Sequence, residues 1–479
     1  MMYIFLGILL LIIIFVSILC YRAYQFKPYE MKEATPPQYE LDQEQIITNF
    51  VDLIRCKTIS NQDMSLIETE EYERLYQILA ERYPLVHEHC EPEFILPTGL
   101  LYTWKGRSSE SPTVCMAHYD VVPVDEDGWS KPAFEGHIES DAIWGRGTLD
   151  TKATFCSIFE ATEQLIASGF VPANDVYLSF AGDEEVDGAS CPAIVAELER
   201  RGIRPALVLD EGGAVVENAF PGVSGECALI GIAEKGSLNV DFKINSRGGH
   251  ASTPPKHTIV GELATAITQV ENHPFSTQFT QPVLEMFDVL GRHSSFGYRI
   301  IFSNLWLFKP VLAVLCKKTG GELNAMLHTT CAFTRMEGGR NYNVLPPHAS
   351  VSANLRLLGN DTIESALDYL ELKIKNPEID VFPIRGMNPS IVSDTKCDAY
   401  ERLQQCIHNS WPEAIVAPYL MMACSDSRHY CRISDRVYRF SAMKLTTEER
   451  AMIHGNDERI TIENLMKTVS FYLDFLQHS

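Results

Sequence analysis

Three short apolar segments, each ended by a charged side chain, constrain the fold of this chain more than any other feature. His118 follows the segment VCMA, Glu185 follows YLSFAGDE, and Asp210 follows ALVL. Short apolar segments bounded by turn residues are typical of buried strands. In an open sheet of parallel strands, residues at the carboxyl ends meet in one crevice. We therefore predict an α/β fold in which these three side chains lie close together.

The segments around these strands alternate between strand-like and helix-like patterns. Helices are predicted at 41–55, 69–82, 152–168 and 462–476. Buried strands are predicted at 113–117, 176–180 and 206–209. Such an alternation of strands and helices predicts a mainly parallel sheet that is covered by helices.

A different pattern begins near residue 236, where apolar and polar residues alternate as in a half-exposed strand. The expected order is a strand at 238–244, a helix at 259–270, strands at 329–334 and 351–357, a helix at 363–373 and a strand at 379–383. This order is a βαββαβ unit, which forms a separate α+β domain. We therefore predict a catalytic domain of residues 41–235 and 387–479, interrupted by a second domain of residues 236–386.

Residues 280–328 enlarge the second domain with a segment that is rich in aromatic and aliphatic side chains. One interpretation is a buried helical hairpin. The other is a hydrophobic wall that faces an apolar substrate or the surface of a membrane. The sequence leaves both open.

The first 20 residues are predicted to form a single-pass transmembrane anchor. Residues 3–20 contain 18 uncharged residues, and a helix of this length spans about 27 Å, close to the ~30 Å of a hydrocarbon core. A cleaved signal peptide is the alternative. Residues 21–40, with three prolines, are expected to be a linker. Arg22, Lys27 and Lys32 follow the span, and the positive-inside rule would then place the body in the cytoplasm.

The composition argues against a nucleic-acid partner and against a site built on paired cysteines. The net charge of −23 argues against a nucleic-acid partner, because binding phosphates requires clustered Lys and Arg. The 13 cysteines contain no C-x-x-C pair. Neither a zinc ribbon nor a redox-active pair of cysteines is therefore expected.

Five residues are predicted to bind two zinc ions: His118, Asp150, Glu185, Asp210 and His454. Imidazole and carboxylate are normal zinc ligands, and a catalytic site needs no thiolate. Asp150 is the expected bridge, which leaves one histidine and one carboxylate for each metal. Two Zn²⁺ ions carry four positive charges, and three carboxylates with one hydroxide balance them.

Two neighbours of these ligands are assigned to catalysis. Glu184 lies beside Glu185 and is expected to point elsewhere, so we predict that it is the general base and then the acid that protonates the leaving amine. Asp120 lies two residues after His118 and can accept the second N–H of its imidazole, which would fix the tautomer.

Five ordered motifs over roughly residues 40–479 resemble the M20 metallopeptidase family. They are HYDVVP, GRGTLDTK, GDEE, LDEGG and HGNDE. The resemblance is strongest to the branch of carboxypeptidase S and N-acyl-amino-acid hydrolases. It implies the ligand and base roles given above, with His118 and Asp210 on one zinc and Glu185 and His454 on the other. It also implies an α/β zinc-hydrolase catalytic domain with an inserted α+β (βαββαβ) lid domain.

The same resemblance suggests four residues that bind substrate. His250 in GGHAS corresponds to a histidine that donates to the tetrahedral oxyanion. Asn343 in NYNVLP and Arg356 in ANLRLL match positions that bind the substrate carboxylate or oxyanion, and the planar fork of Arg suits a carboxylate. Arg428 in ACSDSRHY lies where the family usually has a Gly-Thr-rich turn. A homodimer formed through the lid is left open.

The predicted reaction is zinc-dependent hydrolysis of an amide bond in a small substrate with a free carboxylate, such as an N-acyl amino acid. The same enzyme can run in reverse as a condensation. A membrane-tethered peptide carboxypeptidase is the nearest alternative, and a non-catalytic metal-binding protein is the third. The resemblance favours a lumenal or extracytoplasmic body, against the positive-inside rule, and the sequon at Asn360 is compatible with it.

Overall fold

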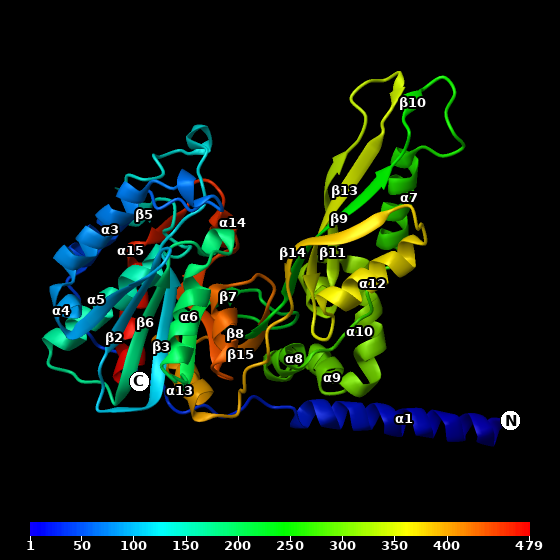
Figure 1. Ribbon diagram of the computed structural model, residues 1–479. Helices are drawn as coiled ribbons and strands as arrows, with labels where there is room; N and C mark the ends of the chain where they lie inside the picture. Colours follow the sequence, from blue (N-terminus) through cyan, green and yellow to red (C-terminus); the bar gives the residue numbers. More distant parts are fainter.

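Two lobes and a separate N-terminal helix make up the protein (Figure 1). The computed structural model describes the backbone of all 479 residues and the side chains of residues 1–318 and 320–479. The larger lobe contains an eight-stranded sheet and the smaller lobe a four-stranded one. The smaller lobe is inserted into the larger between β8 (Glu226–Glu234) and α13 (Asp398–Ser410). This arrangement confirms the predicted α/β fold with an inserted α+β domain.

The sheet of the larger lobe has the strand order β1-β2-β6-β3-β7-β16-β8-β15. Besides β8, its strands are β1 (Cys90–Ile95), β2 (Gly99–Trp104), β3 (Ser108–His118), β6 (Asn174–Ala181), β7 (Leu207–Glu217), β15 (Ile415–Met421) and β16 (Val437–Leu445). The central pairs β3–β6, β3–β7 and β7–β16 are parallel. The antiparallel hairpin of β1 and β2 was not expected from the sequence.

Helices cover this sheet and bury its central strands. They are α2 (Gln43–Ile54), α3 (Thr69–Arg82), α4 (Pro84–His89), α5 (Lys152–Ala167), α6 (Ser190–Arg200), α13, α14 (Thr447–Met452) and α15 (Ile462–Gln477). Strands β4 (His137–Glu139), β5 (Ala142–Trp144) and β17 (Arg459–Thr461) form a small extra sheet. Seven of the eight residues of β6 and 11 of the 16 residues of α5 are buried, because the sheet is covered on both faces.

The smaller lobe, here called the lid, has a fully antiparallel sheet of order β11-β13-β9-β14. Its strands are β9 (Gly236–Asn245), β11 (Thr330–Glu337), β13 (His348–Leu357) and β14 (Asp380–Met387), and its helices are α7 (Ile259–Asn272) and α12 (Ile363–Ile374). The apolar residues of β9 are buried and alternate with exposed or half-exposed ones, as predicted. Strands β10 (Gly249–His250) and β12 (Val344–Leu345) pair at the tip of the lid, at the top of Figure 1.

Residues 280–328 form four helices rather than one hairpin. They are α8 (Gln281–His293), α9 (Phe296–Phe302), α10 (Leu305–Thr319) and α11 (Gly321–Leu327). Helix α8 packs on the edge strand β15 of the larger lobe. The contact buries Phe287 and Phe302 with Phe220 in one apolar cluster. Part of this segment is therefore core, as the first interpretation expected.

The N-terminal helix α1 (Met2–Gln25) continues beyond the predicted anchor and has a mean hydropathy of 3.1 in its most apolar window, of which 6% is buried. By length and composition it can cross a membrane. It lies beside α9, and the chain then runs along the body to α2 (Figure 1). That connecting segment is held at several points; one of them is the Thr35 N–H, which donates to Asn409 Oδ1 at 3.0 Å.

Candidate metal centre

Four of the five predicted metal ligands meet above the carboxyl ends of the central strands. His118 ends β3, Asp150 precedes α5, Glu185 follows β6, and His454 follows α14. The His118 Nε2 atom lies 2.9 Å from Asp150 Oδ1. The His454 Nε2 atom lies 3.1 Å from Asp150 Oδ2 and 3.0 Å from Glu185 Oε2. Asp150 therefore presents one oxygen to each imidazole, as a carboxylate between two cations would.

The second carboxylate beside His118 is Glu211, which the sequence analysis missed. Its Oε1 atom lies 3.4 Å from His118 Nε2. Asp210 instead accepts the N–H of Ser427 at 3.0 Å and is 3% exposed. Both acids line the small cavity beside His118 and Glu184, but of the two it is Glu211 that lies within ion-pair distance of the His118 imidazole. The pair of acids in LDEGG was a signal that either residue could be the ligand.

Asp120 fixes both His118 and the turn that carries the two adjacent glutamates. Its Oδ1 atom lies 3.3 Å from His118 Nδ1. The same carboxylate accepts the backbone N–H groups of Glu184 and Glu185, both at 3.1 Å. One buried side chain thus orients an imidazole and positions the residues predicted as base and ligand.

Glu184 faces a different group of atoms from Glu185. Its carboxylate lies near His118 and Glu211, with the three donor atoms within 4.8 Å of one another. Burial raises the pKa of Glu184 well above its ordinary value; His118 opposes this shift and Glu211 adds to it. A carboxylate whose protonated form is favoured in this way can take up a proton during a reaction and give it back.

The charges of the centre compensate one another only in part. Burial alone would raise the pKa of Asp150, but hydrogen bonds from His118 and His454 lower it. Hydrogen bonds to Asp150 and Glu185 raise the pKa of His454 to about 10. Burial raises the pKa of Glu211 to about 8, although His118 opposes this. Crowded carboxylates paired only with imidazoles suit divalent cations, and the donor types fit zinc.

A second residue that the sequence analysis missed is Glu458, which ties the Asp150 loop to the His454 loop. Its Oε2 atom accepts Arg146 Nη1 at 2.6 Å and the Gly147 N–H at 3.2 Å. Its Oε1 atom accepts the Leu149 N–H at 2.7 Å and the Asp150 N–H at 3.3 Å. Glu458 is fully buried. It therefore positions the backbone of the predicted bridging residue from a distant part of the chain.

Two predicted substrate residues lie at the junction between the lobes. The Arg356 Nη1 atom of β13 lies 3.4 Å from Cys424 Sγ. The Arg428 Nη2 atom lies 3.5 Å from the Lys235 carbonyl and 3.4 Å from the Asn388 carbonyl. Both side chains therefore contact segments that link the lid to the larger lobe.

The other two predicted substrate residues lie together at the tip of the lid. His250 is exposed on β10, and its Nδ1 atom accepts the Ser252 N–H at 3.1 Å. The backbone carbonyl of Asn343 accepts the Ala251 N–H at 3.0 Å. Figure 1 shows β10 at the end of the lid that is distant from β3 and β7. His250 and Asn343 are thus brought to each other but not to His118.

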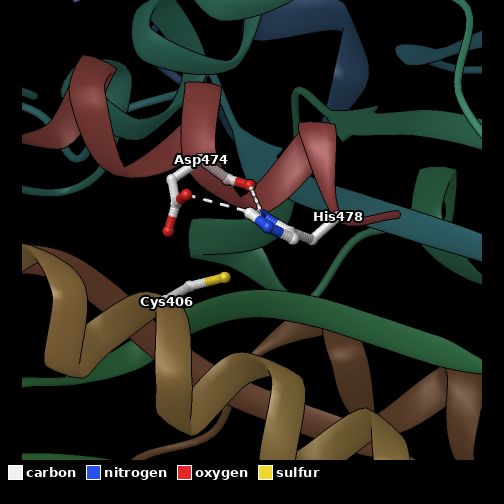
Figure 2. A group of neighbouring side chains, drawn as sticks. All are labelled: Cys406, Asp474 and His478. Carbon is white, nitrogen blue, oxygen red and sulfur yellow. Dashed lines mark hydrogen bonds and ion pairs between the residues drawn. The ribbon is translucent and has the colours of Figure 1, made fainter. Parts of the chain in front are cut away.

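A separate group of Cys406, Asp474 and His478 joins α13 to α15 (Figure 2). The Asp474 carboxylate accepts Asn409 Nδ2 at 3.1 Å, and the His478 Nδ1 atom lies 2.7 Å from the Asp474 carbonyl. Burial raises the pKa of the Cys406 thiol, whereas a metal ligand must be a thiolate. We interpret this group as a contact between two helices.

The chain is similar to several known proteins over most of its length. A model described as Peptidase family M20/M25/M40 matches residues 114–478. A probable carboxypeptidase S-like 2 of Dictyostelium discoideum is 34% identical over 415 residues, which are 85% of this chain and 80% of that protein. The N-fatty-acyl-amino acid synthase/hydrolase PM20D1 of Xenopus tropicalis is 32% identical over 446 residues, 92% of this chain and 87% of that protein.

Solved structures match the fold of both lobes. Human carnosine dipeptidase 1 superposes with a TM-score of 0.65 at 12% identity, covering 92% of this chain and 99% of that one. At such an identity the likeness concerns the fold. It extends over the large sheet and the lid together, so the two-lobed arrangement is shared.

Proposed function

We propose, from the premise that this chain belongs to peptidase family M20/M25/M40, that it is a two-zinc hydrolase of an amide bond in a small substrate with a free carboxylate. By family membership the chain is a peptidase or amidohydrolase enzyme. The single observation that carries the proposal is the position of Asp150 between His118 and His454, with a further carboxylate beside each imidazole.

We assign the zinc ligands from these contacts. Asp150 would bind both ions, His118 and Glu211 would bind one, and Glu185 and His454 would bind the other. Glu211 thereby takes the place that the sequence analysis gave to Asp210. Zinc, when bound, supplies the Lewis acidity that activates water for attack on a carbonyl carbon.

The proton transfers are assigned to Glu184. Its carboxylate lies beside His118 and Glu211 and is separate from the contact between Glu185 and His454. We propose that it takes a proton from the attacking water and gives it to the nitrogen of the leaving amine. The Asp120 Oδ1 atom accepts the Glu184 N–H and so holds the backbone of Glu184 in this position.

The substrate carboxylate is assigned to Arg356. Its guanidinium donates to the thiol of Cys424, a weak acceptor, and therefore keeps other N–H groups for a carboxylate. Arg428 is more enclosed, with a side chain 7% exposed and 3.8 Å from Glu234 Oε2. We propose that Arg428 supports the junction, and that Arg356 makes the direct contact.

The residues of the lid tip need a movement before they can act. We propose that His250 and Asn343 reach the oxyanion only after the lid has moved, either in the same chain or in the second copy of a homodimer.

We also propose that α1 anchors the body on the extracytoplasmic side of a membrane. Asn360, in the N-x-T sequon Asn360-Asp361-Thr362, is exposed and therefore accessible to glycosylation on that side.

An N-acyl amino acid with a long acyl chain is the proposed substrate, with condensation of a fatty acid and an amino acid as the reverse reaction. The relative from Xenopus tropicalis, which matches 92% of the chain, carries the name of an N-fatty-acyl-amino acid synthase/hydrolase. A peptide carboxypeptidase is the second candidate, because the relative from Dictyostelium discoideum is named as one.

One assay separates the two candidates. The value of kcat/KM is measured for an N-long-acyl amino acid and for a dipeptide with the same carboxyl-terminal residue. We expect the acyl substrate to be preferred at least tenfold, and a preference for the dipeptide would favour the carboxypeptidase. Glu184→Gln is the control: it should lower kcat by about 10²–10⁴-fold on either substrate while the metal content is kept. Wild-type turnover by this variant would contradict the assignment of the base.

A further inference from the structure

Helix α10 presents an apolar face to its surroundings. Trp306 and Val311 are each 61% exposed, Val314 is 57% exposed and Leu315 is 54% exposed. Val311 lies three and four positions before Val314 and Leu315, which places these three on one side of the helix, and Trp306, eight positions before Val314, lies at the edge of that side. A helix on the surface of a water-soluble lobe normally presents polar side chains there. Together with exposed Phe296 of α9, these residues form a surface that we call the α9–α10 face.

The α9–α10 face is continuous with the helix that can cross a membrane. The ring of Trp306 packs edge-on against that of Phe15, with 6.4 Å between the centroids and an angle of 89°. The Asn304 Nδ2 atom lies 3.3 Å from the Leu19 carbonyl of α1. Phe15 lies five residues before Cys20, the last residue of the apolar stretch, which is about 7.5 Å along a helix. Trp306 therefore lies beside a part of α1 that would be within the hydrocarbon.

The height of the α9–α10 face relative to α1 is fixed by the segment that follows α1. The guanidinium of Arg292 in α8 lies over the ring of Phe26 at 4.3 Å and over that of Tyr29 at 4.0 Å, and it donates to the Lys27 carbonyl at 2.9 Å. The Tyr29 hydroxyl donates to Asp288 Oδ2 at 2.7 Å. These contacts clamp the chain onto α8, so α1 and the helical segment are one unit rather than two parts joined by a free linker.

Side chains at the margins of this region suit the boundary between lipid and water. Tyr21 and Tyr24, at the end of α1, are 63% and 61% exposed, and amphipathic aromatic rings concentrate at that boundary. Lys317 and Lys318 are exposed at the end of α10, where they can reach the headgroups. Helices α9 and α10 are bent by 103° at their junction, so that α9 lies beside α1 and α10 runs away from it (Figure 1).

We propose that the α9–α10 face is a second membrane-contacting element, embedded at the boundary of headgroups and acyl chains beside α1. Its occupant is the lipid bilayer. This proposal rests on the proposed anchor and goes beyond it, because the enzyme body itself then enters the membrane surface. The lobe junction is thereby held at a fixed height above the leaflet in which an apolar substrate would dissolve.

Tryptophan quenching in vesicles tests this proposal with the full-length protein. The protein is inserted into phosphatidylcholine vesicles, and its emission is recorded with lipids brominated in the acyl chains and, separately, with iodide in the water. The chain has five tryptophans, so Trp306→Phe identifies the signal of Trp306. The emission of Trp306 is the difference between the emission of the unchanged protein and that of the variant. We expect brominated lipid to quench this emission and iodide to leave it unchanged. Amide hydrolysis by Trp306→Phe in detergent serves as the check that the variant has folded.

A matched variant places a tryptophan on the other end of the lid. Tyr342→Trp in the Trp306→Phe background introduces it at a side chain that is 105% exposed, next to β12 at the lid tip. Its emission should be quenched by iodide and not by bromolipid. This control shows that each quencher reports position in the same folded chain.

Three outcomes would overturn the proposal. Quenching of Trp306 by iodide alone would mean that the face is in water. Quenching by neither reagent would mean that protein, such as a second copy of the chain, covers it. Protein that fails to float with the vesicles, or is released from them by alkaline carbonate, would contradict the anchor and this proposal together, whereas the amide-hydrolysis assay would be unaffected.

Discussion

Two kinds of buried carboxylate in the larger lobe differ in how their charge is compensated: those that serve the fold, Glu458 and Glu234, and those of the metal centre. Glu458 is paired with Arg146 and accepts backbone N–H groups on both oxygens. Glu234 is paired with the fully buried Arg439 and accepts the Ser425 N–H at 3.1 Å. Each of these carboxylates has a permanent cation and several donors, which is the condition for burying a charge.

The metal centre has the opposite balance. Its carboxylates, Asp150, Glu185 and Glu211, face one another, and their partners are two imidazoles, which are neutral unless protonated. Burial and like charge together raise the pKa of Glu185 and of Glu211. The difference teaches which acids serve the fold and which serve a ligand: a carboxylate with a permanent cation stabilises the chain, whereas the crowded ones are paired only with imidazoles, whose protons a metal ion can displace.

The largest effect expected from this comparison is that of metal removal. Dialysis against a strong chelator should abolish amide hydrolysis and lower the melting temperature, because the three carboxylates lose their counter-charge. An ion at one hundred times its Kd stabilises the folded state by about 2.7 kcal/mol, so two sites should add to this. Differential scanning calorimetry before and after zinc is restored measures the effect. Full activity of the chelated protein would contradict the distinction between the carboxylates paired with arginine and those of the metal centre.

The second prediction concerns Glu458, where the charge is already balanced. Glu458→Gln removes the anion from a buried pair, and we expect the free energy of unfolding to fall by about 3–5 kcal/mol because Arg146 is left buried without its partner. Urea unfolding of the zinc-loaded protein measures the loss.

The pair of Arg82 and Asp52 provides the matched control. Its N–O distance is also 2.6 Å, but the two side chains are 36% and 22% exposed. Asp52→Asn should therefore cost about 0–1 kcal/mol. Equal losses in the two variants would mean that burial does not distinguish these pairs, against the argument made for Glu458.

The fold could be predicted from the sequence wherever a pattern was local. The alternation of Leu238 to Ile244 and the helical spacing of 69–82 were enough, because each pattern reports one buried face. The candidate ligands could be proposed because one histidine and two acids follow apolar segments of the sequence. Glu458 could not be found, since its role arises from contacts with a loop about 310 positions earlier in the chain. The position of the helical segment beside α1 is likewise a tertiary contact that has no local signature.

The choice between Asp210 and Glu211 was also out of reach of the sequence, because it depends on tertiary contacts: the Ser427 N–H donates to Asp210, whereas Glu211 lies beside His118. It gives the smallest of the expected effects. Glu211→Gln should weaken zinc binding by about tenfold or more, since it removes a charged donor 3.4 Å from His118 Nε2. Asp210→Asn keeps an oxygen for the Ser427 N–H and should change zinc affinity by less than about threefold, with a cost in unfolding free energy of about 1–3 kcal/mol. Competition with a chromophoric chelator measures both affinities. If Asp210→Asn lost the metal and Glu211→Gln kept it, Asp210 would be the ligand. A backbone N–H donor, such as that of Ser427, would then not distinguish a structural carboxylate from a metal ligand.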